Sequence, residues 1–224
     1  MATRRDHYYP NTEPLAPDEM RVIALGTGRP FVRRGQANCS WLIELGNGDK
    51  FIMDFGSGSQ SNFTALEIPP QDVTAYFATH LHADHVDGLG AVLERQPAVE
   101  VFVTWLTSHS SSPRGGRGEG DADAQTRQVL RRHGKVAQRL APGQQVRVGD
   151  AVLDVLWPRR ALAAGSPVNN ASLVLDVATP SVHALMLGDV EREAQAACIG
   201  EVTRRAASRP YDLVKVAHHG SANQ

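Results

Sequence analysis

The sequence of 224 residues has few cysteines, almost no net charge and no long apolar run, and each absence excludes a class of protein. Its two cysteines, Cys39 and Cys198, lie too far apart for a Cys-X-X-Cys zinc site and are too few for a disulfide framework. A formal net charge of −1 excludes a chain that is basic throughout. With no apolar run of roughly 18 residues and no leader-like start, we expect a cytoplasmic chain that does not enter a membrane.

Hydrophobic residues make up 42% of the chain, which is enough to bury one substantial core. We predict an irregular N-terminal arm over residues 1–19 and one domain over residues 20–224. Apolar and alternating runs predict strands at 21–25, 39–45, 51–53, 73–78, 99–103, 135–140, 144–148, 151–156, 171–178, 182–187 and 212–217. Helical patterns fall at 60–68, 86–95, 123–133 and in two stretches between 190 and 207. Meandering strands with helices at intervals favour a layered α/β sandwich over a βαβ barrel.

Two connecting segments stand out by their composition. The run Gly46-Asn-Gly-Asp49 supplies residues that tolerate positive φ, so residues 20–54 are predicted to form a β-meander with a hairpin at this point. Residues 107–122 are rich in Ser, Gly and Arg and have almost nothing to bury, which predicts a mobile loop.

Three histidines and an aspartate lie within six residues directly after the apolar run at 73–78. Imidazole and carboxylate groups are ligands that Zn²⁺, Mn²⁺ and Fe ions accept. At a turn, the i, i+2 spacing lets His80 and His82 hold one cation, while Asp84 and His85 face a second one. The alternative is a solvated polar loop whose histidines are coincidental.

A second apolar run ends in a carboxylate, at Leu185-Met-Leu-Gly-Asp189. Because the run must be buried, the carboxylate lies at the edge of the core. By itself, Asp189 is also a candidate N-cap for a helix that starts at Val190, with Glu191 and Glu193 in its first turn. Because the sequence also contains the histidine cluster, we instead expect Asp189 to bridge two cations.

The last apolar strand leads directly into two consecutive histidines. Because neighbouring side chains point in different directions, we expect His218 to be a further metal ligand and His219 to face the substrate as an acid or oxyanion stabiliser, with roles that can be exchanged. The alternative is a pair of capped, half-exposed histidines. The other histidines have no such context and are expected at the surface: His7, His109, His133 and His183. His109 is also a candidate for a further ligand.

The segment His80-Leu-His-Ala-Asp-His85 resembles the HxHxDH motif of the metallo-β-lactamase superfamily, and the resemblance extends over nearly the whole chain from Met20. It implies an α/β, four-layered αβ/βα sandwich with a site for one or two metal ions along one edge of its two sheets.

Two branches of the superfamily resemble different parts of the chain. Residues 18–87, with Leu25-Gly-Thr-Gly-Arg-Pro30, are similar to RNase Z and alkylsulfatase-like arylsulfatases. Residues 88–224, with Val168-Asn-Asn-Ala-Ser-Leu-Val174, are similar to the hydrolase domain of ComEC-type DNA-internalisation proteins. Five of six phenylalanines lie before residue 90 and fourteen of twenty arginines after it, so a recombined gene is an alternative origin.

The sequence departs from the family pattern in two places. The histidine that the family supplies between the first cluster and the bridging aspartate has no clear counterpart. The ComEC-type domains also continue beyond the segment that here is His218-His-Gly-Ser221, whereas the sequence ends at Gln224. A domain truncated at its C-terminus, with one weakly held metal and impaired catalysis, is therefore among the expectations.

These residues together predict a metal-dependent hydrolase in which a cation-activated water attacks without a covalent intermediate. The expected cofactor is one or two Zn²⁺ ions, with Mn²⁺ or Fe as alternatives, and Asp84 and His219 are the predicted catalytic residues. Both resemblances favour a phosphodiester substrate, cleaved by a nuclease or a small phosphodiesterase. The alternatives are a hydrolase of sulfate esters, lactones or thioesters on the same fold, and a catalytically weak metal-binding remnant.

A local excess of positive charge adds to the case for phosphodiesters. Residues 125–160 contain eight basic and two acidic side chains, and such a patch can neutralise phosphates near the site. The alternative is a solvated helix face and hairpin with scattered arginines. Trp157 is the only aromatic residue of this stretch, so no stacking platform for bases accompanies the charge.

Overall fold

The computed structural model describes residues 13–28, 33–106 and 119–220, and in this part of the chain eleven strands form two sheets. The first sheet has its strands in sequence order: β1 (Met20–Gly26), β2 (Ser40–Leu45), β3 (Lys50–Phe55), β4 (Val73–Ala78), β5 (Glu100–Thr104) and β6 (Gln138–Leu140). Strands β1 to β3 pair antiparallel, which confirms the predicted meander and its hairpin. From β3 to β6 the pairing is parallel, so these strands share one carboxyl edge.

The second sheet is antiparallel except at one edge. Its order is β11 (Leu213–Lys215), β10 (His183–Met186), β9 (Val174–Ala178), β8 (Ala151–Trp157) and β7 (Gln145–Val148). Strands β10 and β11 are parallel, so the segments that follow them leave the sheet on the same side.

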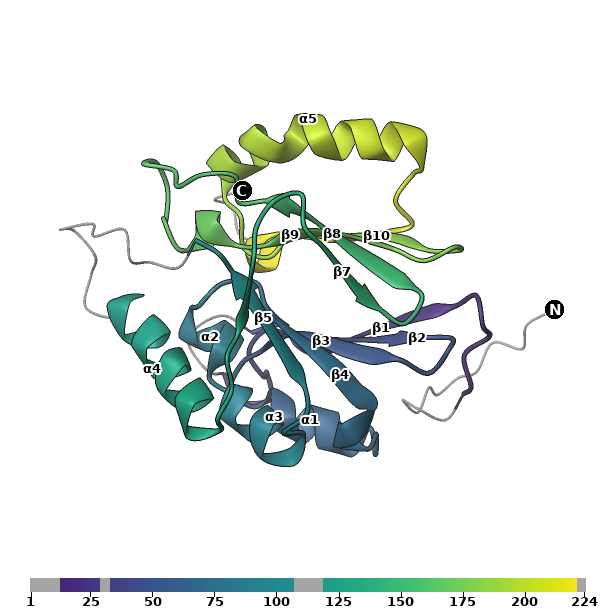
Figure 1. The fold of residues 1–224 in the computed structure, drawn as a ribbon, viewed down its shortest axis with the longest axis vertical. Coiled ribbons are helices and arrows are strands. Elements are labelled where there is room, and N and C mark those ends of the chain that lie inside the picture. Colours follow the sequence, from purple (N-terminus) through teal and green to yellow (C-terminus); the bar gives the residue numbers. More distant parts are fainter. Residues whose placement is uncertain (1–12, 29–32, 107–118, 221–224) are drawn as a thin grey trace.

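Helices cover the outer face of each sheet, and the two sheets face each other (Figure 1). The first sheet carries α1 (Ser59–Ala65), α2 (Ala83–Val86), α3 (Leu89–Arg95) and α4 (Glu119–Arg132), and the second carries α5 (Arg192–Ser208). Short 3₁₀ turns are η1 (Pro70–Asp72), η2 (Asn169–Ala171) and η3 (His218–Gly220). This arrangement confirms the predicted four-layered αβ/βα sandwich.

Three apolar clusters hold the four layers together, and strand β3 shows how one sequence serves two of them. Phe51 and Met53 enter the cluster between the sheets, whereas Ile52 and Phe55 enter the cluster beneath α1 and α3. The period of two in a strand separates Ile52 from Phe51 and Met53, and the left-handed φ of 58° at Asp54 interrupts this period, so Phe55 joins the face of Ile52. A third cluster, which includes Ala194 and Cys198 of α5, lies between that helix and the second sheet.

Two predicted helices differ from the structure. The predicted helix 86–95 is broken between α2 and α3, because the amide of Gly88 donates to Phe55 O at 2.7 Å and a Cβ there would lie 2.5 Å from the Phe55 ring. Conversely, the two predicted stretches between 190 and 207 are the single helix α5, which accommodates Gly200 because one exposed helical glycine costs only about 1 kcal/mol.

Smaller differences concern boundaries. Strand β9 starts at Val174, three residues later than predicted, because η2 precedes it, and α4 starts at Glu119 rather than Asp123. The candidate ligand His109 and most of the predicted loop 107–122 lie outside the described residues. None of the helices that the structure describes is both long enough and apolar enough to cross a membrane.

Candidate metal centre

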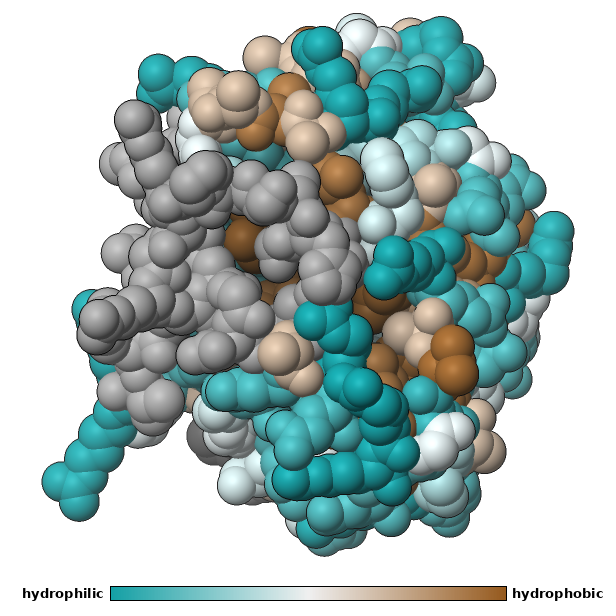
Figure 2. Space-filling model, turned by 60° about the vertical axis from the view of Figure 1, so that its left-hand side comes forward, coloured by the Kyte–Doolittle hydropathy of each residue, from teal (hydrophilic) through white to brown (hydrophobic). Residues whose placement is uncertain are grey.

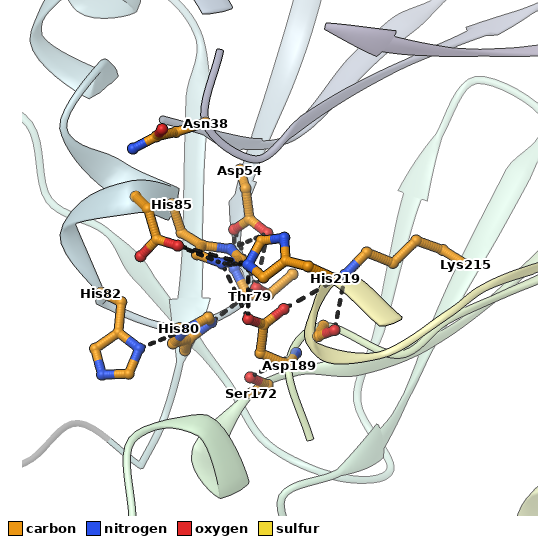
Figure 3. A network of polar contacts seen from close by, with 12 residues as sticks. Asn38, Asp54, Thr79, His80, His82, His85, Ser172, Asp189, Lys215 and His219 are labelled. Carbon is orange, nitrogen blue, oxygen red and sulfur yellow. Dashed lines mark hydrogen bonds and ion pairs between the residues drawn. The ribbon is translucent and has the colours of Figure 1, made fainter. Parts of the chain in front are cut away.

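Three strand ends meet at one place between the two sheets, and each brings polar side chains (Figure 3). The turn after β4 carries His80 to His85, the segment after β10 carries Asp189, and η3 after β11 carries His219. The parallel pairing of β10 with β11 brings the last two segments to one side of the second sheet. We refer to His80, His82, Asp84, His85, Asp189 and His219 as the candidate metal centre.

The two histidines of the i, i+2 pair lie as expected for a shared ion. His80 Nε2 and His82 Nδ1 are 3.0 Å apart. His80 is fully buried and His82 is half-buried. Their nitrogens therefore face one small space at the border of the core.

A buried carboxylate behind the centre sets the protonation of two histidines. Asp54 accepts hydrogen bonds from the Thr79 hydroxyl at 2.8 Å and from His85 Nδ1 at 2.8 Å. Because the Thr79 hydroxyl gives its proton to Asp54, its oxygen accepts from His80 Nδ1 at 3.2 Å. In their neutral forms both His80 and His85 then carry a proton on Nδ1, and both offer the Nε2 lone pair to the centre.

Asp189 is the carboxylate that reaches both sides of the centre. Its Oδ2 lies 3.2 Å from His85 Nε2 and 3.1 Å from His219 Nε2. Asp84 Oδ2 lies 3.7 Å and 3.5 Å from the same two nitrogens. Two groups of three result, His80 with His85 and Asp189, and Asp84 with His85 and His219, and within each group the ligand atoms all lie within 4.8 Å of one another.

The structure distinguishes the two consecutive histidines that follow β11. His219 Nε2 is 3.3 Å from His85 Nε2, whereas His218 belongs to neither group and its Nδ1 is buried with no hydrogen-bond partner among the described residues. The backbone causes this choice: His218 and His219 have φ of 46° and 53°, and Gly220 continues at 71°. Left-handed backbone at non-glycine residues is costly and concentrates at functional sites.

A buried lysine balances the negative charge on the same side. Lys215 Nζ donates to Gly188 O at 2.7 Å and lies 3.5 Å from Asp189 Oδ1. The amide of Asp189 in turn donates to Ser172 Oγ at 3.1 Å. The carboxylate that reaches both groups is thus held at its backbone and at the oxygen that faces away from the histidines.

The charges of the centre shift several pKa values. Burial, with the nearby His85, holds the pKa of His80 well below its usual value. Burial also opposes charge on His219, but its hydrogen bonds to Asp189 and Asp84 outweigh this and raise its pKa to about 9. The pKa of Asp189 lies well below the ordinary value despite burial, because His85 and His219 stabilise its carboxylate. The raised pKa of His219 and the lowered pKa of Asp189 mean that an imidazolium proton lies between carboxylates. A divalent cation can take the place of that proton.

The donor set fits a borderline divalent cation. Imidazole nitrogen and carboxylate oxygen are what Zn²⁺, Mn²⁺ and Fe ions accept, and in the neutral forms of His80 and His85 the free lone pair is on Nε2, because Thr79 and Asp54 accept from Nδ1. A third group, Cys39 with Asp54 and His85, is a weaker candidate because Asp54 already accepts hydrogen bonds on both oxygens.

Sequence reasoning missed the residues that support the ligands. Asp54 has a recognisable signal, since it is a carboxylate inside the apolar run Phe51-Ile-Met-Asp-Phe55, and its φ of 58° is unusual for a strand. Lys215 has the same signal, a charge between two apolar neighbours near the end of a strand. Thr79 carries no signal of its own.

The fold is that of the metallo-β-lactamase proteins, as the resemblance in the sequence implies. The metallo-β-lactamase fold protein YhfI from Bacillus subtilis superimposes with a TM-score of 0.57 at 17% identity, covering 77% of this chain and 63% of that one. A putative metallo-β-lactamase from Thermotoga maritima superimposes with a TM-score of 0.51 at 17% identity, covering 76% and 78%.

The sequence comparisons match less than half of the chain. A family model described as "Anti-Pycsar protein Apyc1" matches residues 20–97. The ribonuclease Z of Mycobacterium marinum is 31% identical over 94 residues, which is 42% of this chain and 30% of that protein. The ribonuclease Z of Methanococcus aeolicus is 33% identical over 75 residues, 34% of this chain and 23% of that protein. The match thus spans less than a third of these curated relatives. The similarity of the C-terminal part to ComEC-type domains stays a prediction.

Proposed function

We propose that this protein is a metal-dependent hydrolase that cleaves phosphodiesters at the candidate metal centre. The observation that carries the proposal is the convergence of Asp189 and His219, from two other strand ends, on His85 at 3.2 and 3.3 Å. Ionisable groups buried together in this way cost stability unless they are paired or hold a metal, and such clusters are typical of functional sites. The metallo-β-lactamase fold of the neighbouring structures supports the same reaction class.

In this proposal His80, His82 and Asp189 would hold one ion and Asp84, His85 and His219 would hold a second, with Asp189 as the carboxylate that lies near both sets. A neutral imidazole has one free lone pair, so His85 serves one ion only, although it belongs to both groups of three. This assignment exchanges the predicted roles of His218 and His219, because the structure turns His219 toward Asp189. When bound, such a cation acidifies a water molecule and polarises the bond under attack.

The residues of this chain prepare the centre for that chemistry. Asp54 orients His85 and, through Thr79, also orients His80, so that both rings present Nε2. Lys215 and the histidines offset the negative charge of Asp189, which keeps the buried carboxylate ionised near neutral pH. His218, whose Nδ1 makes no hydrogen bond with the described residues, is left to face the substrate.

Phosphodiesters are favoured as substrates because the sequence relatives are ribonuclease Z proteins, whose name specifies RNA cleavage. The test is a panel of chromogenic esters with protein that has been stripped with a chelator and reloaded with Zn²⁺ or Mn²⁺. We expect bis(p-nitrophenyl) phosphate to be hydrolysed in the loaded protein and not in the stripped protein. Turnover of a sulfate ester, lactone or thioester without phosphodiester turnover would assign the protein to the rival substrate class. Tight metal binding with no turnover of any ester would identify it as a metal-binding remnant.

A further inference from the structure

A pocket of about 300 Å³ lies between α4, β5 and β6 and is also lined by a residue of the turn that follows β4. Its apolar wall includes Leu81, Val103 and Leu130. Leu81 stands between His80 and His82 in the chain, so the pocket and the centre share one turn. Val103 pairs in register with Ala78, two residues before His80, which places this wall on the strand next to the one that leads to the centre.

Four basic side chains line the same pocket: Arg127, Arg131, Lys135 and Arg139. No acidic residue is among the described residues that line it. We call this pocket, with its apolar wall and four basic residues, the basic pocket. It contains half of the eight basic residues counted between positions 125 and 160. Figure 2 turns this side of the molecule toward the viewer, and its lower part, at the level of α4, is mostly hydrophilic.

The basic side chains come from α4, from β6 and from the loop between them, so the position of one element does not explain all four. Arg127 and Arg131 lie one turn apart on α4, and the C-terminus of this helix stabilises a cation at Arg131 through its dipole. Arg139 comes instead from β6, where it pairs in register with Val103. Paired residues of neighbouring strands share a face of the sheet, so Arg139 points to the same side as the apolar wall.

Backbone carbonyls hold two of the four basic side chains, those of Arg131 and Lys135. Arg131 Nε donates to Arg127 O at 3.3 Å, and Lys135 Nζ donates to Val99 O at 3.1 Å. Among the side chains that the structure describes, no carboxylate forms an ion pair with Arg131, Lys135 or Arg139. A carbonyl orients a cation without cancelling its charge, so like charges remain close together and an anion would relieve their repulsion.

We infer that the basic pocket binds a nucleotide unit of the substrate next to the bond that is cleaved. The guanidinium and ammonium groups would hold its phosphate, and the wall of Leu81, Val103 and Leu130 would cover the base or sugar. The volume is at the lower end of the range for small-ligand sites, which suits one nucleotide unit. The inference rests on the proposed phosphodiester substrate, and it names the place where the flanking part of that substrate lies.

The direct test is a calorimetric titration of the metal-loaded full chain with adenosine 5′-monophosphate. We expect the monophosphate to bind. Adenosine and inorganic phosphate should each bind about tenfold more weakly, because each lacks one half of the recognised ligand. The double variant R131E/R139E should lower the affinity for the monophosphate at least about tenfold. The matched control is R147E, which reverses an exposed arginine of the same charged stretch on β7, in the other sheet.

A kinetic measurement separates this pocket from the metal centre. The ratio of kcat/KM for a tetranucleotide to that for bis(p-nitrophenyl) phosphate should fall about tenfold in R131E/R139E and stay constant in R147E. Any of three results would overturn the inference: the monophosphate does not bind, its affinity is the same in the double variant, or R147E loses as much affinity as the double variant. If the loaded protein hydrolyses no phosphodiester, the proposed function fails, but the titration still decides whether the pocket binds the nucleotide.

Discussion

The candidate metal centre and the basic pocket adjoin the same turn, but they are built in opposite ways. In the centre, ionisable groups are buried and each is fixed by a neighbour, as Asp54 fixes His85 at 2.8 Å. In the pocket, basic groups such as Arg131 and Arg139 lie at the surface. The centre depends on the orientation of its side chains, whereas the pocket depends on its net positive charge. Single changes should therefore have large effects in the centre and modest, salt-sensitive effects in the pocket.

The largest expected effect comes from the carboxylate that reaches both groups. Asp189→Asn keeps the shape of the side chain but removes the charge that lies 3.2 Å from His85 and 3.1 Å from His219. We expect a loss of phosphodiesterase turnover greater than the roughly 100-fold that removal of an outer partner of a metal ligand causes. Turnover of bis(p-nitrophenyl) phosphate at saturating Zn²⁺ measures this, with circular dichroism to establish folding. Turnover within twofold of the parent protein would show that Asp189 is not a functional part of the centre.

The next effect tests whether orientation matters in the centre. Asp54→Asn leaves one carbonyl oxygen, which cannot replace both Oδ1, the acceptor for the Thr79 amide, and Oδ2, the acceptor for His85 Nδ1, so the tautomer of His85 is no longer fixed. We expect metal affinity to fall by about 10- to 100-fold, measured by competition with a chromogenic chelator. Glu44→Gln is the matched control, because Glu44 is a buried carboxylate of the same sheet that pairs with Arg21 instead. Equal losses in both variants would show a general effect on the sheet.

Salt should separate the two regions without any mutation. For two contacted phosphates, raising the salt concentration from about 50 to 200 mM should increase the KM of a single-stranded oligonucleotide roughly sevenfold. The turnover number should change little, since buried charges are screened less than exposed ones. An oligonucleotide KM that does not depend on salt would argue against a role for the basic pocket.

A smaller effect concerns the stability of metal-free protein. The hydrogen bonds of His219 to Asp189 and Asp84 raise its pKa to about 9, above the unfolded value of about 6.5. A raised pKa in the folded state contributes stability that is complete below the unfolded pKa and is lost as the pH rises through the folded pKa. Urea denaturation of chelator-treated protein should therefore show stability falling between about pH 6.5 and 9, with a smaller fall in His219→Gln. The same fall in both proteins would assign the effect to other groups.

The parts of the molecule that depend on local sequence were predictable. The HxHxDH turn, the hairpin at Gly46–Asp49 and the boundaries of β4 each follow from a few adjacent residues, and the layered sandwich follows from their order. The points at which a helix is interrupted were predicted less well. Gly88 interrupts a helix because it is pressed against Phe55, whereas Gly200 does not because nothing approaches it, and the sequence shows neither environment.

The supporting residues of the site depend on contacts across the chain. Asp54 meets His85 across 31 positions, so its carboxylate could be seen in the sequence but its partner could not. Which of His218 and His219 points into the centre depends on their left-handed backbone, and two consecutive histidines in a sequence do not indicate this conformation. In the same way, the charge excess at 125–160 did not show that Arg131 and Arg139 would line one pocket while Arg147 lies in the other sheet.

The most direct test of the account is anomalous diffraction at the zinc absorption edge from crystals of the loaded protein. We expect one or two peaks, one beside His80, His82 and Asp189 and the other beside Asp84, His85 and His219. Peaks found only elsewhere, or these side chains turned away from any bound ion, would contradict a hydrolase built on this centre.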